Sequence, residues 1–387
     1  MYLQIAYLVY AISPCANTIR TWTLKIGYYE LTREKEKAND WIIILDFSIQ
    51  VGKDKVFLIY GIRKSKVPIG RALQISDLQT LHLSYKPVWK AEDVHKVLVE
   101  LKTSLGDILY VISDNGSELK AGIESAGIKR VYDLTHALAN ITEKIFKDDE
   151  IYNQVTTAMS NMRVALSQTD SAHLIPVKQR KKSHYQNIKT ISDYLIVFLR
   201  CVKEKRFEIE LTHRKKQLEW VIQYESFINN FSELNIVISQ IEKILKTEGL
   251  SKKTIKASLI IINMHGNNPY IDRLKEGLKK YLKNILINFP KEKLLLCTSD
   301  VIESAFGKYK NFTSQNPMAG VTNLVLCLAA FTHPLTRESI ISALETVKVK
   351  DIKNWNSGNV ENSVYKKRQI YFSTTEKWNE LYNENSD

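Results

Sequence analysis

Between residues 41 and 133 the chain alternates between apolar runs of strand length and segments with helical spacing. Apolar runs predict buried strands at 41–49, 55–62, 108–113 and 129–133. A further strand is expected within 69–84, and Gly52 stands between the first two runs in a hairpin-like turn. Strand-like segments therefore open this region before helices begin to alternate with strands.

Helical periodicity separates the later strands from one another. Apolar side chains recur every three or four residues over 91–105, which predicts a helix that Gly106 closes. Further helices are expected over 117–126 and from about residue 137. The order β-β-β-α-β-α-β-α implies parallel pairing of the later strands and helices on both faces of the sheet. The sequence thus predicts an α/β fold with a mixed sheet.

A second region, residues 147–290, has helical patterns almost throughout, few strand-like runs and several basic clusters. It predicts an all-α domain inserted into the α/β domain, because helical patterns suited to that domain return at 299–310 and 320–347. We therefore expect a helical segment with a charged linker at 1–40, followed by the first part of the α/β domain at 41–146 and the helical insertion at 147–290. The C-terminal helices of the α/β domain are expected at 291–350, and a polar tail at 351–387.

The amino-terminal segment contains one amphipathic helix pattern. Trp22 and Ile26 share one face, whereas Arg20 and Lys25 lie largely elsewhere. This pattern suits the recognition helix of a helix-turn-helix, with Arg20 and Lys25 toward DNA, and it also suits an ordinary helix. The apolar stretch at 1–12 is too short to cross a bilayer and has no basic residue before Arg20, so it predicts a buried helix rather than a membrane span or a signal peptide.

Composition adds a strong positive charge to this picture. The chain has 55 Lys and Arg against 42 Asp and Glu, hence a net charge of +13, which favours a polyanionic partner such as nucleic acid or an acidic membrane. Its 4 cysteines are scattered without metal-ligand spacing, which indicates a reducing compartment and no structural zinc. We expect a cytoplasmic protein without a membrane partner, and nucleic acid is then the favoured polyanion.

Acids stand at the ends of two predicted strands. Asp46 ends the apolar run that begins at Trp41, and Asp114 directly follows the run at 108–113. The carboxyl ends of strands are where α/β proteins bind ligands, and two carboxylates brought together there repel each other unless a divalent cation joins them. Mg²⁺ prefers such oxygen ligands, and two ions suit in-line phosphoryl transfer. Each acid taken alone also suits a turn.

The layout of these residues resembles the RNase H-like fold of DDE transposases and retroviral integrases. Asp46 fits the first acid of that family, Asp114 the second, and Glu303, on a late helix, the third. Glu303 follows Asp114 by 189 residues, a separation that an α-helical insertion explains. Asp300, one turn earlier, is the rival third acid. The resemblance implies that Asp46, Asp114 and Glu303 hold two Mg²⁺ ions, for which Mn²⁺ can substitute.

A second motif, Asp-Leu-Thr-His, occupies 133–136. It resembles the Cys/Asp-x-x-His motif that hAT transposases and the V(D)J recombinase, which also carry helical insertions, have after the corresponding strand. The resemblance places His136 near the scissile phosphate, where it would help to orient that group, with Asp133 beside it. A histidine at the start of a helix, bonded to Asp133, is the alternative interpretation.

Lys310 follows Glu303 by seven positions and so lies two turns away on the same helix face. This spacing resembles that of bacterial insertion-sequence transposases, and it implies that Lys310 reaches a DNA phosphate, with Lys308 as a further DNA contact. The tyrosine and arginine that those transposases have before the glutamate are absent, since Leu296 and Ser299 stand there.

The predicted insertion supplies further candidate DNA contacts. Arg180, Lys181 and Lys182 form a basic cluster suited to phosphate, although such runs also form solvated helix faces. In related transposases a tryptophan of the insertion stacks on a flipped base, and Trp220 is the candidate in this chain. Trp220 stands beside apolar residues such as Leu218, which also suits a helix core.

These patterns together predict a DNA transposase that acts as a homodimer on paired ends, in the bacterial cytoplasm and associated with the nucleoid. Metal-dependent cleavage of element ends, followed by strand transfer to target DNA, would use the same Asp-Asp-Glu triad. A structure-specific nuclease on the same fold is the first alternative. A catalytically inactive DNA-binding relic is the second; the abrupt amino terminus favours a relic, whereas the presence of all three acids does not.

Overall fold

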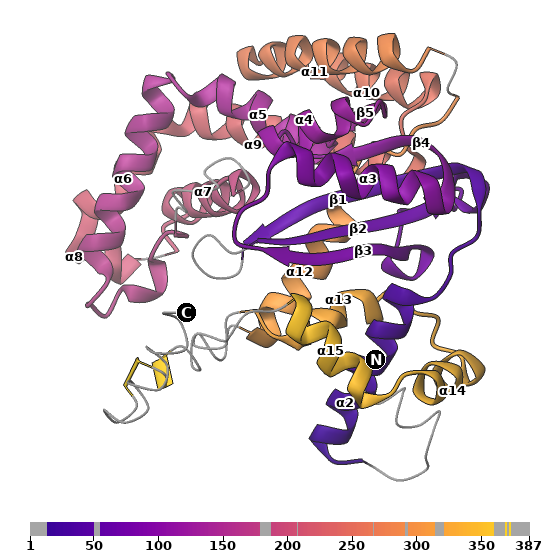
Figure 1. Cartoon of the computed structure of the whole chain (residues 1–387). Coiled ribbons are helices and arrows are strands. Elements are labelled where there is room, and N and C mark those ends of the chain that lie inside the picture. Colours follow the sequence, from indigo (N-terminus) through magenta and orange to yellow (C-terminus); the bar gives the residue numbers. More distant parts are fainter. Residues whose placement is uncertain are drawn as a thin grey trace. The chain divides into compact units, whose positions relative to one another are not determined.

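The chain forms two compact units, Met1–Asp133 with Thr298–Asp387, and Leu134–Cys297. The computed structural model (Figure 1) describes residues 14–49, 55–178, 187–206, 208–265, 267–290, 293–313, 321–359, 368–369 and 371–372. The buried helix predicted within 1–12 and the turn predicted at Gly52 lie outside these residues. No helix in the described part is long and apolar enough to cross a membrane.

The first unit is built on a mixed five-stranded sheet in the order β3-β2-β1-β4-β5. The strands are β1 (Ala38–Ile49), β2 (Lys55–Arg63), β3 (Gln79–Lys86), β4 (Gly106–Ser113) and β5 (Arg130–Tyr132). β2 pairs antiparallel with both β1 and β3, whereas β1, β4 and β5 run parallel to one another. The predicted strands and their alternation with helices are thus confirmed, and the third strand occupies the end of the 69–84 segment.

One face of the sheet is covered by α3 (Ala91–Leu105) and α4 (Ser117–Ser125), which pack on each other (Figure 1). Alternate side chains of β1, among them Ile43 and Leu45, share a core with Val111 of β4 and with apolar residues of both helices. This is the two-residue periodicity of a buried strand, and it assigns one side of β1 and β4 to this core.

The other face is covered by helices from the C-terminal part of the chain. These are α12 (Asp300–Thr313) and α13 (Cys327–Ala330), which η5 (Asn323–Leu326) directly precedes. The hydroxyl of Tyr60 in β2 donates a 2.7 Å hydrogen bond to the carbonyl of Leu328 in α13, and α12 packs against both β1 and α13. The predicted α/β class, a mixed sheet flanked by helices and interrupted by a helical region, is confirmed.

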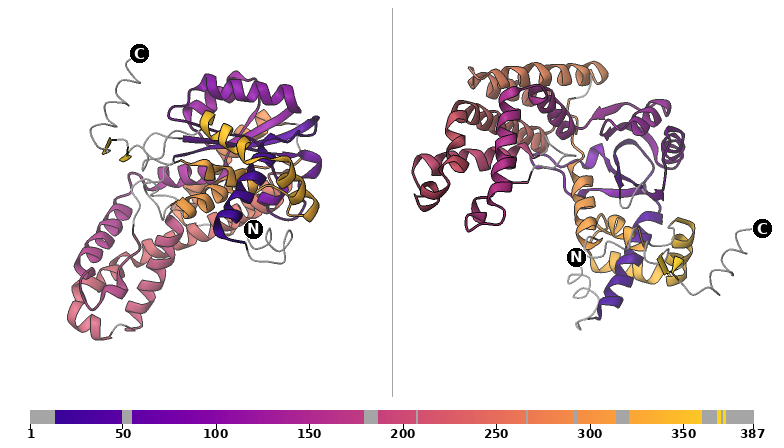
Figure 2. Two further views of the ribbon diagram at one scale, coloured as in Figure 1. Left: turned by 60° about the horizontal axis from the view of Figure 1, so that its bottom comes forward. Right: turned by 90° about the vertical axis from the view of Figure 1, so that its left-hand side faces the viewer.

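Helix α2 (Ala16–Thr32) packs among the C-terminal helices, which include α14 (Arg337–Thr346) and α15 (Val349–Asn359) (Figure 2). Ile26 is fully buried against Ile340 and two alanines. Gly27 permits a close approach, because a Cβ there would lie 2.1 Å from the carbonyl oxygen of Leu326. The amino-terminal helix therefore belongs to the first unit, and the start of the predicted polar tail is helical, with Ile352 buried.

In the part of the second unit that the structure describes, the regular elements are helices, with one short bridge between Leu250 and Leu295. Its helices are α5 (Leu134–Phe146), α6 (Glu150–Leu166), η3 (Ala172–Leu174), α7 (Ile188–Lys203), α8 (Glu208–Leu218), η4 (Glu219–Tyr224), α9 (Glu225–Glu248), α10 (Lys252–Met264) and α11 (Pro269–Asn288). The ring of Phe146 is fully buried, 5.3 Å from that of Phe231. Because α5 contributes to this core, the unit begins at Leu134, earlier than the predicted boundary at 147.

Candidate active site

Asp46, within β1, and Asp114, directly after β4, occupy equivalent positions along two neighbouring parallel strands. Ile44 of β1 is paired with Ile112 of β4, and each acid stands two residues beyond its member of that pair. Since side chains alternate along a strand, both acids point away from the core that contains Leu45, toward the sheet face that α12 and α13 cover.

A local hydrogen bond orients each of these carboxylates. Oδ1 of Asp46 accepts a 2.7 Å bond from the Phe47 backbone N–H, and Oδ1 of Asp114 accepts a 2.9 Å bond from the Gly116 N–H. Asp114 therefore forms the turn that its Asp-Asn-Gly sequence predicts. Both side chains are half-buried. Asp114 directly follows β4, as predicted, whereas Asp46 lies within β1, which continues to Ile49 through its pairing with β2.

Arg130 holds the turn that carries Asp114. Its guanidinium donates a 2.7 Å hydrogen bond to the Asp114 carbonyl and a 2.9 Å bond to the Asn115 side chain. Burial lowers the pKa of Arg130, against the opposing effect of nearby acids that include Glu124 and Asp114. Sequence reasoning missed this residue, although its position in β5, the strand next to β4, was a usable signal.

Glu303 stands in the first turn of α12, and its side chain is half-buried. The helix is held by its apolar face, since Ile302 and Tyr309 are fully buried. The Glu303 backbone N–H donates a 3.3 Å hydrogen bond to the carbonyl of Ser299, directly before the helix. Glu303 thus lies on the helix that packs against β1, the strand of Asp46.

Asp133 connects the start of α12 to the end of β4. Its fully buried carboxylate accepts hydrogen bonds at Oδ2 from the Ser299 backbone N–H, at 2.6 Å, and from the Ser299 hydroxyl, at 2.9 Å. Its own backbone N–H donates a 3.0 Å bond to the carbonyl of Ser113. Asp133 is therefore a supporting residue of the first unit. His136 lies in α5 of the second unit, where its side chain is half-buried.

The donor chemistry of Asp46, Asp114 and Glu303 fits Mg²⁺, which prefers carboxylate oxygen. The strand register puts two of these three acids, Asp46 and Asp114, at matching positions. Within the described ranges, however, no group of three or more His, Cys, Asp or Glu side chains stands together as a metal-binding cluster. The roles of Asp46, Asp114 and Glu303 as metal ligands, and the ions themselves, remain predictions.

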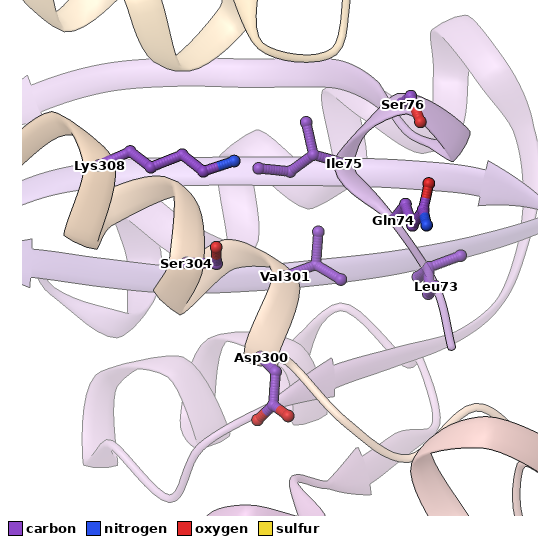
Figure 3. Close-up of a pocket in the computed structure, with 8 residues that line it drawn as sticks. All are labelled: Leu73, Gln74, Ile75, Ser76, Asp300, Val301, Ser304 and Lys308. Carbon is purple, nitrogen blue, oxygen red and sulfur yellow. The ribbon is translucent and has the colours of Figure 1, made fainter. Parts of the chain in front are cut away.

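The exposed edge of α12 borders a cavity of about 500 Å³ (Figure 3). Its lining comes from α12 and from the segment before β3: Leu73, Gln74, Ile75, Ser76, Asp300, Val301, Ser304 and Lys308. Figure 3 shows the Lys308 side chain extending from the helix toward Ile75. Asp300, the rival third acid, belongs to this cavity, and Lys310 is exposed on the same helix.

The two side chains of α2 that were predicted to contact DNA form hydrogen bonds within the first unit. Arg20 donates a 2.9 Å hydrogen bond to the Asn323 side chain, and Lys25 donates a 2.8 Å bond to the carbonyl of Leu344. The structure thus joins α2 to the C-terminal helices through the two side chains that a recognition helix would present. A role for Arg20 and Lys25 in DNA binding remains a prediction.

In the second unit Trp220 is half-buried in an aromatic cluster of η4 and α7. Its ring lies 6.4 Å from that of Phe198 and 6.1 Å from that of Tyr224. This packing is what the core interpretation of Trp220 expects, and base stacking by Trp220 remains a prediction. The cluster of Arg180, Lys181 and Lys182 lies outside the described residues.

No family model matches the sequence, and no curated protein matches it. Among solved structures, the chain is similar to one described as the Drosophila P element transposase strand transfer complex. That similarity has a TM-score of 0.39 with 11% sequence identity, and it covers 82% of this chain and 85% of the other.

Proposed function

We propose that this chain is a DNA transposase of the Asp-Asp-Glu type, with Asp46, Asp114 and Glu303 as its catalytic residues. The observation that carries the proposal is the register of β1 and β4, which puts Asp46 and Asp114 at equivalent positions on the sheet face covered by α12. Glu303 supplies a third carboxylate from that helix. The large helical unit between Asp114 and Glu303 matches the insertion that the sequence layout requires.

Both proposed reactions are phosphoryl transfers. In cleavage, a water oxygen bonds to the phosphorus at the element end while the bond from phosphorus to the 3′-oxygen breaks, leaving a 3′-hydroxyl. In strand transfer, that hydroxyl attacks a target phosphodiester, and the 3′-oxygen of the target leaves. Two divalent cations, when bound, would supply Lewis acidity and lower the pKa of the attacking water. The hydrogen bonds from Phe47 and Gly116 would keep two of the carboxylates oriented.

DNA as the substrate is supported by the charge of the chain, since +13 at neutral pH favours a polyanion. Lys308 and Lys310 are exposed on the helix of Glu303. Phosphate contacts of this kind position the duplex without reading its sequence. A homodimer on paired ends would bring two such sites to one synaptic complex.

The test is cleavage and joining of a plasmid that carries the gene's own flanking DNA, with Mg²⁺ or Mn²⁺ present. We expect breaks at the element ends and joined products from the unsubstituted chain, and neither from Asp114→Asn or Glu303→Gln. Asp300→Asn, on the same helix one turn earlier, is the matched control and should retain both activities.

Three outcomes would change the proposal. Loss of activity in Asp300→Asn with retention in Glu303→Gln would make Asp300, rather than Glu303, the third acid. Cleavage without joining would favour a structure-specific nuclease. DNA binding that is unchanged by the substitutions, without any cleavage, would favour an inactive relic.

A further inference from the structure

A continuous series of hydrogen bonds connects the residue before Asp114 to Glu303. It begins at the carbonyl of Ser113, which accepts the backbone N–H of Asp133 at 3.0 Å. The Asp133 carboxylate accepts both the N–H and the hydroxyl of Ser299, at 2.6 and 2.9 Å. The carbonyl of Ser299 then accepts the N–H of Glu303 at 3.3 Å. Asp133 thus joins the end of β4 to the first turn of α12.

The hydrogen bonds between Asp133 and Ser299 are shielded from water. Asp133 is 0% exposed and Ser299 is 2% exposed, so the bonds between them form away from solvent. A buried carboxylate is costly unless donors satisfy it, and charge-assisted hydrogen bonds are shorter and stronger than neutral ones. Its negative charge also lies at the amino-terminal end of α12, where the helix dipole is favourable. Asp133 and Ser299 therefore fix the point at which α12 begins.

The position of that starting point sets the position of Glu303. Glu303 is four residues after Ser299, one helical turn along, so its backbone is placed by the same carbonyl that Asp133 holds in position. The Asp133 backbone is in turn bonded beside Asp114. A shift of Ser299 relative to β4 would therefore change the separation of the second and third acids.

We propose that Asp133 and Ser299 are positioning residues, which set where Glu303 stands relative to Asp114 so that both acids can bind one divalent cation. This inference rests on the proposed function, because it assumes that Glu303 and Asp114 bind the same metal site. It gives the buried acid of the Asp-Leu-Thr-His motif a role within the first unit, through Ser299, that does not involve substrate contact.

The test is Mn²⁺ binding by the full chain, followed through the electron paramagnetic resonance signal of free Mn²⁺. Supporting residues of metal sites typically change affinity by about 10–100-fold when they are replaced. We expect Ser299→Ala to raise the dissociation constant within that range and Ser299→Thr, which keeps the hydroxyl, to restore it. Ser304→Ala, exposed on the same helix and without a bond to Asp133, is the matched control and should bind Mn²⁺ normally.

A double variant shows whether Ser299 acts through Glu303. In the Glu303→Gln background the Ser299→Ala substitution should cause no further loss, because the ligand that Ser299 positions is already changed. A further loss equal to that in the unsubstituted chain would overturn the proposal. So would Ser299→Ala with normal affinity while Asp114→Asn and Glu303→Gln bind weakly; that result would leave the catalytic triad intact. An unsubstituted chain that does not bind Mn²⁺ would overturn both the triad and its positioning.

If Asp133→Asn is too unstable to study, Ser299→Ala still tests the proposal, since the Ser299 backbone N–H remains available to Asp133. A purely structural role predicts a lower melting temperature for Ser299→Ala with unchanged Mn²⁺ affinity of the folded protein. The positioning role predicts weaker Mn²⁺ binding even at temperatures where the variant is fully folded.

Discussion

Asp46 and Asp114 stand at matching positions of two parallel strands, each two residues past the paired Ile44 and Ile112. Side-chain alternation directs both carboxylates to one sheet face. Under the proposed function a divalent cation joins the two acids, which would otherwise repel each other. Such an arrangement suits cation binding, whereas two neighbouring carboxylates without a cation do not stabilise the fold. It also makes the pair testable by stability measurements that do not require a DNA substrate.

Neutralising one acid should relieve that repulsion. We expect Asp46→Asn, measured by urea unfolding in EDTA, to be as stable as the unsubstituted chain or more stable, by up to about 1 kcal/mol. The amide oxygen can still accept the bond from the Phe47 N–H. Added Mg²⁺ should raise the melting temperature of the unsubstituted chain but not of Asp46→Asn. A clear destabilisation of Asp46→Asn in EDTA would show that Asp46 has a structural rather than a ligand-binding role.

Two glycines in helices should respond in opposite ways to alanine. At Gly27 a Cβ would lie 2.1 Å from the Leu326 carbonyl oxygen, so Gly27→Ala should destabilise the chain by roughly 1–3 kcal/mol through forced separation of α2 and η5. At Gly307, in α12, a Cβ meets nothing within 4 Å, and Gly307→Ala should stabilise by up to about 1 kcal/mol through helix propensity. Urea unfolding measures both; equal effects would contradict the packing of α2.

A buried ionic cluster anchors α2 and should make stability depend on acid. Burial raises the pKa of Glu30, but hydrogen bonds from His333, at 3.1 Å, and from Arg33, together with the charge of Lys35, outweigh it, so that the pKa lies below its ordinary value. A depressed carboxyl pKa stabilises the fold above the unfolded-state pKa, about 4.3, and this contribution is lost as the pH falls through the folded-state value.

Unfolding free energies measured between pH 7 and pH 3 should therefore decrease most steeply below about pH 4. Glu30→Gln should be less stable at neutral pH and should show a shallower acid slope. The same slope in Glu30→Gln as in the unsubstituted chain would assign the acid sensitivity to other carboxylates.

Replacing Arg130 should affect both stability and catalysis. Arg130→Gln loses the hydrogen bonds to the Asp114 carbonyl and to Asn115, so we expect about 1–3 kcal/mol of destabilisation together with reduced DNA cleavage. Lys120→Gln, on the exposed face of α4, is the control and should be close to neutral, because surface ion pairs contribute little. Normal cleavage by a folded Arg130→Gln would show that the turn does not need this support.

The sheet was predictable from the sequence because its signals are local. Each strand is a run of apolar residues, and Asp114 directly follows one of these runs. Asp46 was expected to end the first strand, but β1 continues to Ile49 because Phe47, Ser48 and Ile49 also pair with β2. Ser299 carries no such signal. The bond between Ser299 and Asp133 joins residues 166 positions apart, and nothing in either local sequence indicates it.

Domain boundaries were less predictable for a related reason. The segment from Leu134 to Phe146 is an ordinary amphipathic helix by sequence, and only its packing against α9 and α11 assigns it to the second unit. Likewise, the sequence predicts only a polar tail from residue 351, whereas Val349–Asn359 is a helix that buries Ile352. A single buried side chain in a polar segment is too weak a pattern to predict packing.

The most direct test of the central claim is the location of Mn²⁺ in crystals of the full chain, from its anomalous scattering. We predict a peak bound by carboxylate oxygens of both Asp46 and Asp114, with Glu303 completing the ligands, and its loss in Asp114→Asn crystals. Mn²⁺ found only elsewhere, for example beside Asp300, at a concentration that supports DNA cleavage would contradict the assignment of this active site.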